Sequence, residues 1–221
     1  MIVAIPTMYL SHLDNLLSRT KEIDFSSVEK IFIFNNTENN YNIPNEKFHV
    51  FNLGRNIGVN AVWNHALKIA ATKNSSLMLL NDDVIIKNDF FFKTQEALDD
   101  NSKYPVVCPF TVNIKSDLYS SYKSVIDKRY ILMRRRAGWA FTINKNFISK
   151  IPLMPDSMSI FFGDDWIWHF TGGLWVKDND NVIFHTIGRT TRKHKDLRAR
   201  YSSDKKVFRF FMEKIKNENA F

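Results

Sequence analysis

The sequence contains a single cysteine, Cys108, among its 221 residues, so an internal disulfide is excluded. No apolar run reaches the roughly 18 residues that a helix needs to span a bilayer. The first residues, Met1 to Pro6, carry neither a basic segment nor a small-residue cleavage site, so they do not resemble a signal peptide. From these absences we expect a cytoplasmic protein.

Internal repeats, low-complexity tracts and linkers are also missing. Hydrophobic residues make up 44% of the chain, with 19 phenylalanines, a composition that excludes a disordered protein. A chain of this length can form one sizeable α/β domain and is short for two. We therefore expect one domain over residues 1–221, made of a first half (1–100), a second part (101–190) and a C-terminal segment (191–221).

Acidic residues are scarce towards the C-terminus. Residues 186–216 hold eleven Lys and Arg against three Asp and Glu, an excess equal to the net charge of +8 for the whole chain. Such a patch is typical of binding to a polyanion or an anionic membrane surface, and equally of a solvated lysine-rich face. The residues that we expect to contact a polyanion are Arg189, Arg192, Lys193, Lys195, Arg198 and Arg200.

Short apolar runs alternate with helical patterns in the first hundred residues. We predict strands at residues 2–5, 30–34, 48–51 and 76–80, with helices at 10–20 and 59–72. This alternation indicates an α/β fold with a central, mostly parallel sheet flanked by helices. The later part is less regular, and we expect strands at 104–110 and 138–143, a loop at 113–136 and a final amphipathic helix at 203–216.

Polar clusters follow three of the predicted strands. They are Pro6-Thr7, Asn35-Asn36 and Asn81-Asp82-Asp83. Ligands of such sheets bind beyond the carboxyl ends of the strands, so we expect these clusters to meet in one crevice. Carboxylates at this position suit Mg²⁺ or Mn²⁺, which are usually held by one or two carboxylates plus substrate phosphates. The alternative is an ordinary acidic turn.

A second acidic pair occurs at Gly163-Asp164-Asp165, between two aromatic-rich runs. A carboxylate among aromatic residues is partly desolvated, which raises its pKa and suits a general base. The alternative is a helix N-terminus with an acidic first turn, and both interpretations can hold together. His185 follows another apolar run, where a lone histidine is either structural or a ligand.

Four blocks, taken in order, resemble the family 2 glycosyltransferases of the GT-A fold. The apolar strand that ends in Asn35-Asn36 resembles the family strand that contacts the nucleotide base. Residues 52–58, with Asn64, resemble its Asn-x-Gly-x-x-Gly-type block. Leu80-Asn81-Asp82-Asp83-Val84 resembles its variant DXD motif, and Gly163-Asp164-Asp165 resembles its Gly-Glu-Asp motif.

The resemblance implies a GT-A-like nucleotide-diphospho-sugar transferase fold and a metal-dependent, inverting transfer of a sugar to a hydroxyl. The donor would be a UDP- or dTDP-linked sugar, and Asp165 the general base. Mn²⁺ or Mg²⁺ would be held by Asp83 with Asn81, Asp82 and His185. Donor contacts are implied for Pro6, Thr7, Asn35, Asn36, Arg55, Asn56 and Asn64. The sugar or acceptor pocket is implied for Gly138, Trp139, Asp164 and Trp166.

Two positions depart from the family pattern. Asn35 stands where Asp is usual, which affects which nucleotide base the donor carries. Ile167 stands where a second acidic residue is usual. The acceptor stays open between a surface or lipid-linked glycan and a hydroxymethylated base in DNA, which would have to be exposed or flipped. Peripheral contact with a membrane is a further option for the basic segment.

Two other classes of protein compete with this hypothesis. A non-catalytic nucleic-acid-binding protein on a degenerate domain would explain the basic segment but not the second acidic pair. A nucleotidyltransferase would also use a parallel sheet and acidic metal ligands, but the chain lacks a Gly-rich, Lys-containing loop near the first strand.

Replacing Arg192, Lys193 and Lys195 by Glu is expected to weaken binding to double-stranded DNA of any sequence, because phosphate neutralisation does not depend on sequence. Gel shifts at several salt concentrations measure this, and flotation with anionic liposomes is run beside them. Flotation without any DNA shift at low salt would favour a lipid-linked glycan as the acceptor.

Overall fold

A nine-stranded sheet forms the centre of the molecule, in the order β3-β2-β1-β4-β8-β6-β9-β5, with β7 paired to β9. The computed structural model describes residues 1–18, 22–114, 128–186 and 195–218. The strands are β1 (Ile2–Thr7), β2 (Lys30–Asn35), β3 (Phe48–Asn52), β4 (Leu77–Leu80), β5 (Val84–Ile85), β6 (Val106–Ile114), β7 (Tyr130–Leu132), β8 (Ala140–Ile143) and β9 (Trp175–Thr186). The helices are α1 (Leu10–Leu17), α2 (Val59–Lys73), α3 (Phe90–Asp100), α4 (Lys145–Ile148), α5 (Gly163–Phe170) and α7 (Lys195–Glu218).

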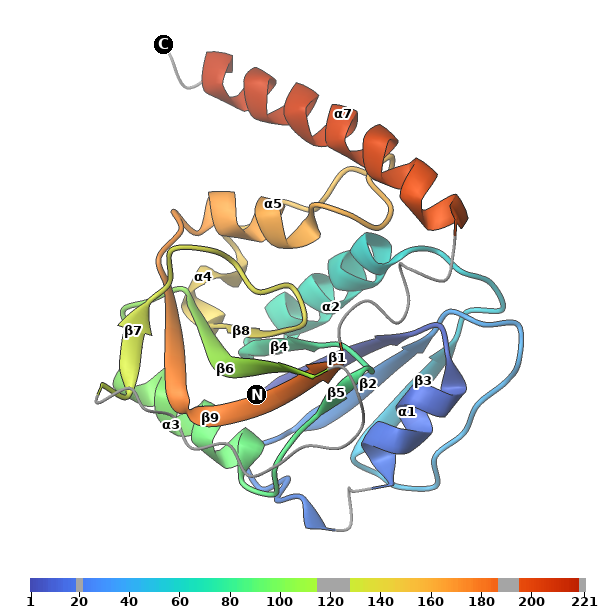
Figure 1. Cartoon of the computed structure of the whole chain (residues 1–221), viewed down its shortest axis with the longest axis vertical. Coiled ribbons are helices and arrows are strands. Elements are labelled where there is room, and N and C mark those ends of the chain that lie inside the picture. Colours follow the sequence, from blue (N-terminus) through green and yellow to red (C-terminus); the bar gives the residue numbers. More distant parts are fainter. Residues whose placement is uncertain (19–21, 115–127, 187–194, 219–221) are drawn as a thin grey trace.

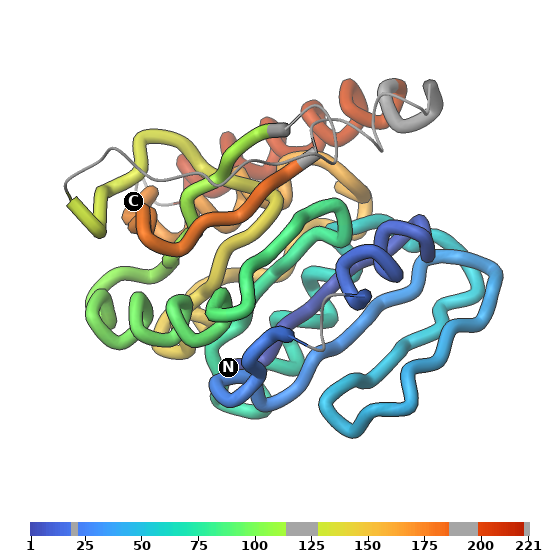
Figure 2. The backbone as a smooth tube through the Cα atoms, turned by 60° about the horizontal axis from the view of Figure 1, so that its bottom comes forward, coloured from blue at the N-terminus to red at the C-terminus, as the bar shows by residue number. Residues whose placement is uncertain are grey.

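The sheet has a parallel half and a mixed half. β3, β2, β1 and β4 are parallel to one another, whereas β8 runs antiparallel to both β4 and β6. β6 and β9 are parallel again, with β5 and β7 antiparallel to β9. The two halves lie side by side in the tube view, blue to cyan and green to orange (Figure 2). The predicted α/β fold with a mostly parallel central sheet flanked by helices is confirmed.

Successive side chains of β1 enter different cores. Ile2 and Ala4 belong to one apolar cluster, and Val3 and Ile5 to the other. The first cluster includes the buried face of α2, and the second includes buried residues of α1 and α3. Figure 1 shows α2, α5 and α7 on one side of the sheet and α1 and α3 on the other. Because both faces are covered, β1 and β4 are apolar along most of their length.

The second half differs from the sequence prediction. β9 has 12 residues, although the sequence pattern shows only a short apolar run, at residues 182–184 before His185. Its register with β6 shifts between Pro109 and Phe110, so a bulge carries the polar residues 178–181 through the sheet. β6 extends to Ile114 and β7 lies at 130–132, so both ends of the predicted 113–136 loop contain strand residues.

The final helix is longer than predicted. α7 has 24 residues and begins at Lys195 instead of 203. Arg189, Arg192 and Lys193 lie outside the residues that the structure describes, and the side chains of Lys195 and Arg198 are likewise not described. Within the described part of the chain, no helix is both long and apolar enough to cross a bilayer.

Candidate functional site

A crevice of about 270 Å³ opens at the carboxyl ends of β1 and β4. Thr7, at the end of β1, donates a hydrogen bond from Oγ1 to Oδ2 of Asp82 at 2.5 Å. The backbone N–H of Asn36 donates to the carbonyl of Thr7 at 2.9 Å and so joins the end of β2 to the same edge. The predicted residues that line the crevice are Pro6, Thr7, Asn36, Asn56, Asn81, Asp82, Asp83, Gly138 and Asp164. The three polar clusters therefore converge, as the strand order predicts.

The opposite wall of the crevice is mainly apolar. It is formed by Ile160, Phe161 and Phe162, with Trp63 of α2 and Tyr9 contributing more aromatic surface. Sequence reasoning did not assign this wall, although its residues directly precede the second acidic pair. An apolar lining with a few convergent polar groups is characteristic of sites for small organic ligands.

Gly58 allows the loop before α2 to approach this wall closely. Its φ is +87°, and a Cβ atom at this position would lie only 2.3 Å from the carbonyl oxygen of Ser159. The side chains of Asn36 and Asn56 accept hydrogen bonds from the N–H groups of Ile57 and Gly58 at 3.1 and 2.9 Å. The glycine-containing block therefore shapes the crevice through its backbone.

Asp82 is a largely buried carboxylate, as exposed as its neighbour Asp83 to within one per cent. Its Oδ1 lies 3.9 Å from Nδ1 of His12, and its side chain is 11% exposed. Burial raises the pKa of Asp82 to about 7; the charge of Asp83 adds to this rise, whereas the hydrogen bond from Thr7 opposes it. A carboxyl group with such a pKa carries a proton during part of the time at neutral pH.

Asp83 faces His185. Its Oδ2 lies 3.6 Å from Nε2 of the imidazole, because β5, which follows Asp83, pairs with β9 so that Val84 is opposite His185. The imidazole stacks on Trp139, with ring centroids 4.9 Å apart and planes 17° from parallel. Its Nδ1 lies 3.4 Å from Oδ1 of Asn113. Trp139 and Asn113 therefore orient the ring so that Nε2 points towards Asp83.

Asp83 and His185 have the chemistry for a shared cation. Oδ1 of Asp83 is buried and has no hydrogen-bond partner, so one carboxylate oxygen is left for a ligand. Among the described residues there is no group of three or more His, Cys, Asp or Glu arranged to hold a metal ion. To hold a cation, these two side chains would therefore need further ligands, such as the oxygens of a substrate.

The second acidic pair begins α5 and is bridged by an arginine. Arg136 places Nε 3.2 Å from Oδ2 of Asp164 and Nη2 2.6 Å from Oδ2 of Asp165. Burial raises the pKa of Asp164 and of Asp165, and the guanidinium of Arg136 opposes both rises. Asp164 lines the crevice, whereas Asp165, the predicted base, lies one residue further along the helix. Arg136 was not predicted to belong to the site, and the only sequence feature that marks it is the run Arg134-Arg135-Arg136.

Three residues predicted to bind substrate instead make hydrogen bonds within the fold. The Asn35 amide donates to Asn39 O and Asn52 Oδ1, and its oxygen accepts from Thr37. Asn64 exchanges two hydrogen bonds with the backbone of Met154, and Trp166 is 3% exposed and donates to Pro152 O. All three lie outside the lining of the crevice because their polar groups stabilise the fold. Arg55 is exposed, and Arg200 donates to Oγ of Ser159 at 3.3 Å.

No family model matches the sequence, and no curated protein matches it either. Solved structures do match. S. aureus TarS 1–349 superposes with a TM-score of 0.62 at 12% identity, over 84% of this chain and 60% of that one. GalNAc-T7, solved with UDP, GalNAc and Mn²⁺, has a TM-score of 0.61 at 13% identity, over 84% of this chain and 43% of that one.

TarS 1–349 has also been solved with UDP-GlcNAc, and that structure has a TM-score of 0.58 at 14% identity, over 86% of this chain and 59% of that one. The chain has the fold of the GT-A glycosyltransferases, so the predicted resemblance is confirmed for the fold. It spans about 60% or less of the length of these proteins.

Asp82→Asn is expected to change how the free energy of unfolding depends on pH. The folded-state pKa of about 7 lies above the ordinary aspartate value of 3.8, so the folded state binds more protons between these values and the wild type loses stability as pH rises through them. The Asn variant does not titrate, so it should gain about 2 to 3 kcal/mol relative to wild type between pH 5 and 8.

Urea denaturation with a chelator present measures this difference. Asp99→Asn, at an exposed position on α3, is the control and should follow the wild type. Parallel pH profiles for wild type and Asp82→Asn would show that Asp82 titrates normally.

Proposed function

We propose that the protein is a glycosyltransferase that binds a nucleoside-diphosphate sugar in the crevice and transfers the sugar to an acceptor hydroxyl. The observation that carries this proposal is the pair of separate acidic groups at one crevice of a GT-A fold. One group, with Asp83, is buried beside His185, and the other, with Asp164, is bridged by Arg136 at the start of α5. A donor site needs a cation-binding end, and a transfer site needs a base, so two distinct environments are useful here.

The donor site would use the polar edge of the crevice and the Asp83–His185 pair beside it. Pro6, Thr7 and Asn36 are available for the base and ribose, and the buried Asp83–His185 pair for the diphosphate. Asp83 and His185, helped by Asp82 or Asn81, would hold Mn²⁺ or Mg²⁺. When bound, such an ion neutralises charge on the leaving diphosphate. GalNAc-T7 was solved with UDP and Mn²⁺, and TarS 1–349 with UDP-GlcNAc, which supports a uridine-based donor.

The transfer step would use a carboxylate of the second pair. As the acceptor oxygen bonds to the anomeric carbon, its proton moves to the carboxylate, and the bond from that carbon to the diphosphate oxygen breaks. Direct displacement inverts the anomeric configuration. The burial that raises the pKa of Asp164 and Asp165 makes each a better base. The family resemblance favours Asp165 as the base, and the exposure of Asp164 to the crevice makes Asp164 the competing choice.

Arg136 would limit how freely either carboxylate accepts a proton. Its bridge to Asp164 and Asp165 stabilises their ionised forms, so the acceptor hydroxyl must approach the oxygen atoms that the guanidinium leaves uncovered. The acceptor itself stays open between a glycan and a hydroxymethylated DNA base. Slow hydrolysis of a nucleotide sugar by the purified protein would separate this function from a non-catalytic nucleic-acid-binding protein or a nucleotidyltransferase.

Asp83→Ala is expected to abolish the metal-dependent part of nucleoside-diphosphate binding and to leave the fold intact, because it removes the buried carboxylate that faces His185. Calorimetric titration of UDP with and without Mn²⁺ measures this. Asp99→Ala on α3 is the control. Unchanged Mn²⁺-dependent affinity in Asp83→Ala would disprove the assignment of the cation site.

Asp164→Asn and Asp165→Asn should separate the two candidate bases. Asn is nearly isosteric with Asp but cannot take up the proton, so replacing the base should lower transfer by roughly 10² to 10⁴-fold and keep donor affinity. The variant of the other residue should lose much less. Single-turnover transfer rates, with donor affinity measured in parallel, decide between them; if both variants kept more than roughly a tenth of wild-type transfer, neither residue would be the base.

A further inference from the structure

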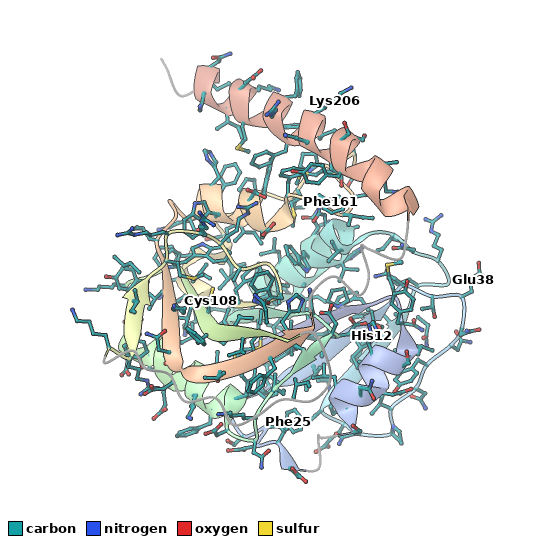
Figure 3. The ribbon with its side chains drawn as sticks, in the orientation of Figure 1. His12, Phe25, Glu38, Cys108, Phe161 and Lys206 are labelled. Carbon is teal, nitrogen blue, oxygen red and sulfur yellow. The ribbon has the colours of Figure 1, made fainter. Side chains whose placement is uncertain are left out.

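The apolar wall of the crevice is a short strip of backbone held between two helices. Residues 158–162 run from the end of the preceding loop to the start of α5, with α2 on one side and α7 on the other. Phe161, which is labelled in Figure 3, contacts Tyr201 of α7 with ring centroids 5.2 Å apart. The strip has no regular secondary structure, so its polar backbone groups need partners from elsewhere.

α2 binds the carbonyl groups of this strip. The amide of Asn60 donates to the carbonyls of Met158 and Phe161 at 2.9 and 3.0 Å. Its own backbone N–H donates to the carbonyl of Ser159 at 3.1 Å. Three carbonyls of the strip are thereby satisfied by one residue in the first turn of α2.

α7 binds the N–H groups of the same strip. The carboxylate of Asp204 accepts from Ser159 N at 3.3 Å and from Ile160 N and Phe161 N, both at 2.9 Å. Asp204 is only 2% exposed. Successive backbone N–H groups that converge in this way form a strong site for an anion, and here the anion is a side chain of the protein.

The strip ends in a residue with an unfavourable backbone conformation. Phe162 has a φ of +66°, which costs free energy for a residue that carries a Cβ. Its ring lines the crevice and stacks on Phe208 of α7, with centroids 5.4 Å apart and planes 18° from parallel. Trp166 N, in the first turns of α5, donates to Phe162 O. The conformation of Phe162 therefore sets where α5 begins, and with it the position of Asp164.

We infer that α7 is a structural part of the acceptor side of the site, and that Asp204 and Phe208 are positioning residues for Asp164 and the apolar wall. A basic helix that served only as a polyanion-binding tail would not need a buried aspartate bonded to three N–H groups of the crevice wall. The catalytic consequence of this inference rests on the proposed glycosyltransferase activity, whereas its structural part does not.

The structural part is tested by hydrogen exchange. Asp204→Asn keeps the size of the side chain but removes the charge that the three N–H groups share, so amides 159–161 should exchange about tenfold faster or more, as expected for loss of a charge-assisted bond. Glu213→Gln, at an exposed position of the same helix, removes one charge in the same way and should leave these amides unchanged. Equal exchange in both variants would overturn the inference.

The catalytic part is tested by transfer kinetics. We expect Asp204→Asn and Phe208→Ala to lower kcat by about ten- to a hundredfold, the loss that a displacement of about 1 Å can cause, with donor affinity unchanged. Phe210→Ala is the control for Phe208→Ala, because Phe210 lies on the same helix and is 62% exposed. A loss of donor affinity equal to the loss of kcat would indicate general unfolding and overturn the positioning role.

Failure of the proposed function is distinguishable from failure of this inference. If the wild type transfers no sugar from any donor, the function is wrong, while the exchange of amides 159–161 still decides whether Asp204 holds the wall. If the wild type transfers sugar and Phe208→Ala behaves like Phe210→Ala, the function stands and the role of α7 is wrong.

Discussion

Burial of the parallel strands on both faces is the constraint on which the site depends. β1 and β4 are covered by α2 on one side and by α1 and α3 on the other, so polar side chains can occur only where these strands end. Thr7 and Asn81–Asp83 follow directly from this rule, and parallel pairing brings their strand ends to one edge. The polar floor of the crevice is thus a consequence of how the core is built.

The two acidic groups are both partly buried, and their charged neighbours make them differ. Each loses solvation near the crevice, but the first faces imidazole groups of His12 and His185, whereas the second is bridged by the permanent charge of Arg136. Burial raises the pKa of Asp82 to about 7. Asp164 and Asp165 instead share a guanidinium that keeps negative charge available. A single crevice therefore has two acidic groups in different electrostatic surroundings.

The first half of the fold and the floor of the crevice could be predicted because apolar runs and polar strand ends are local signals. β9 could not, since residues 177–181 are polar and most of them buried, with Asp178 bonded to Arg129 and Asn181 to Phe90 and Thr94. Asn35 and Asn64 were assigned to the donor because a sequence does not reveal that an amide is consumed by the backbone of distant residues. Asp164 and Asp165 are adjacent in sequence, and only the orientation of α5 distinguishes them. Arg136 reaches both from 28 and 29 residues away, a separation that no local pattern reports.

The strip between α2 and α7 is synthesised before one of the residues that hold it in place. β1, β2, α2 and β4 leave the ribosome before the wall and can form the floor of the crevice ahead of it, because domains form from the N-terminal side as the chain emerges. The wall follows, but its N–H groups find their carboxylate only when Asp204 has been made. A chain interrupted before α7 would keep the floor and expose unpaired amides beside aromatic rings. α7, which follows the wall in the chain, therefore completes the hydrogen bonding of the wall.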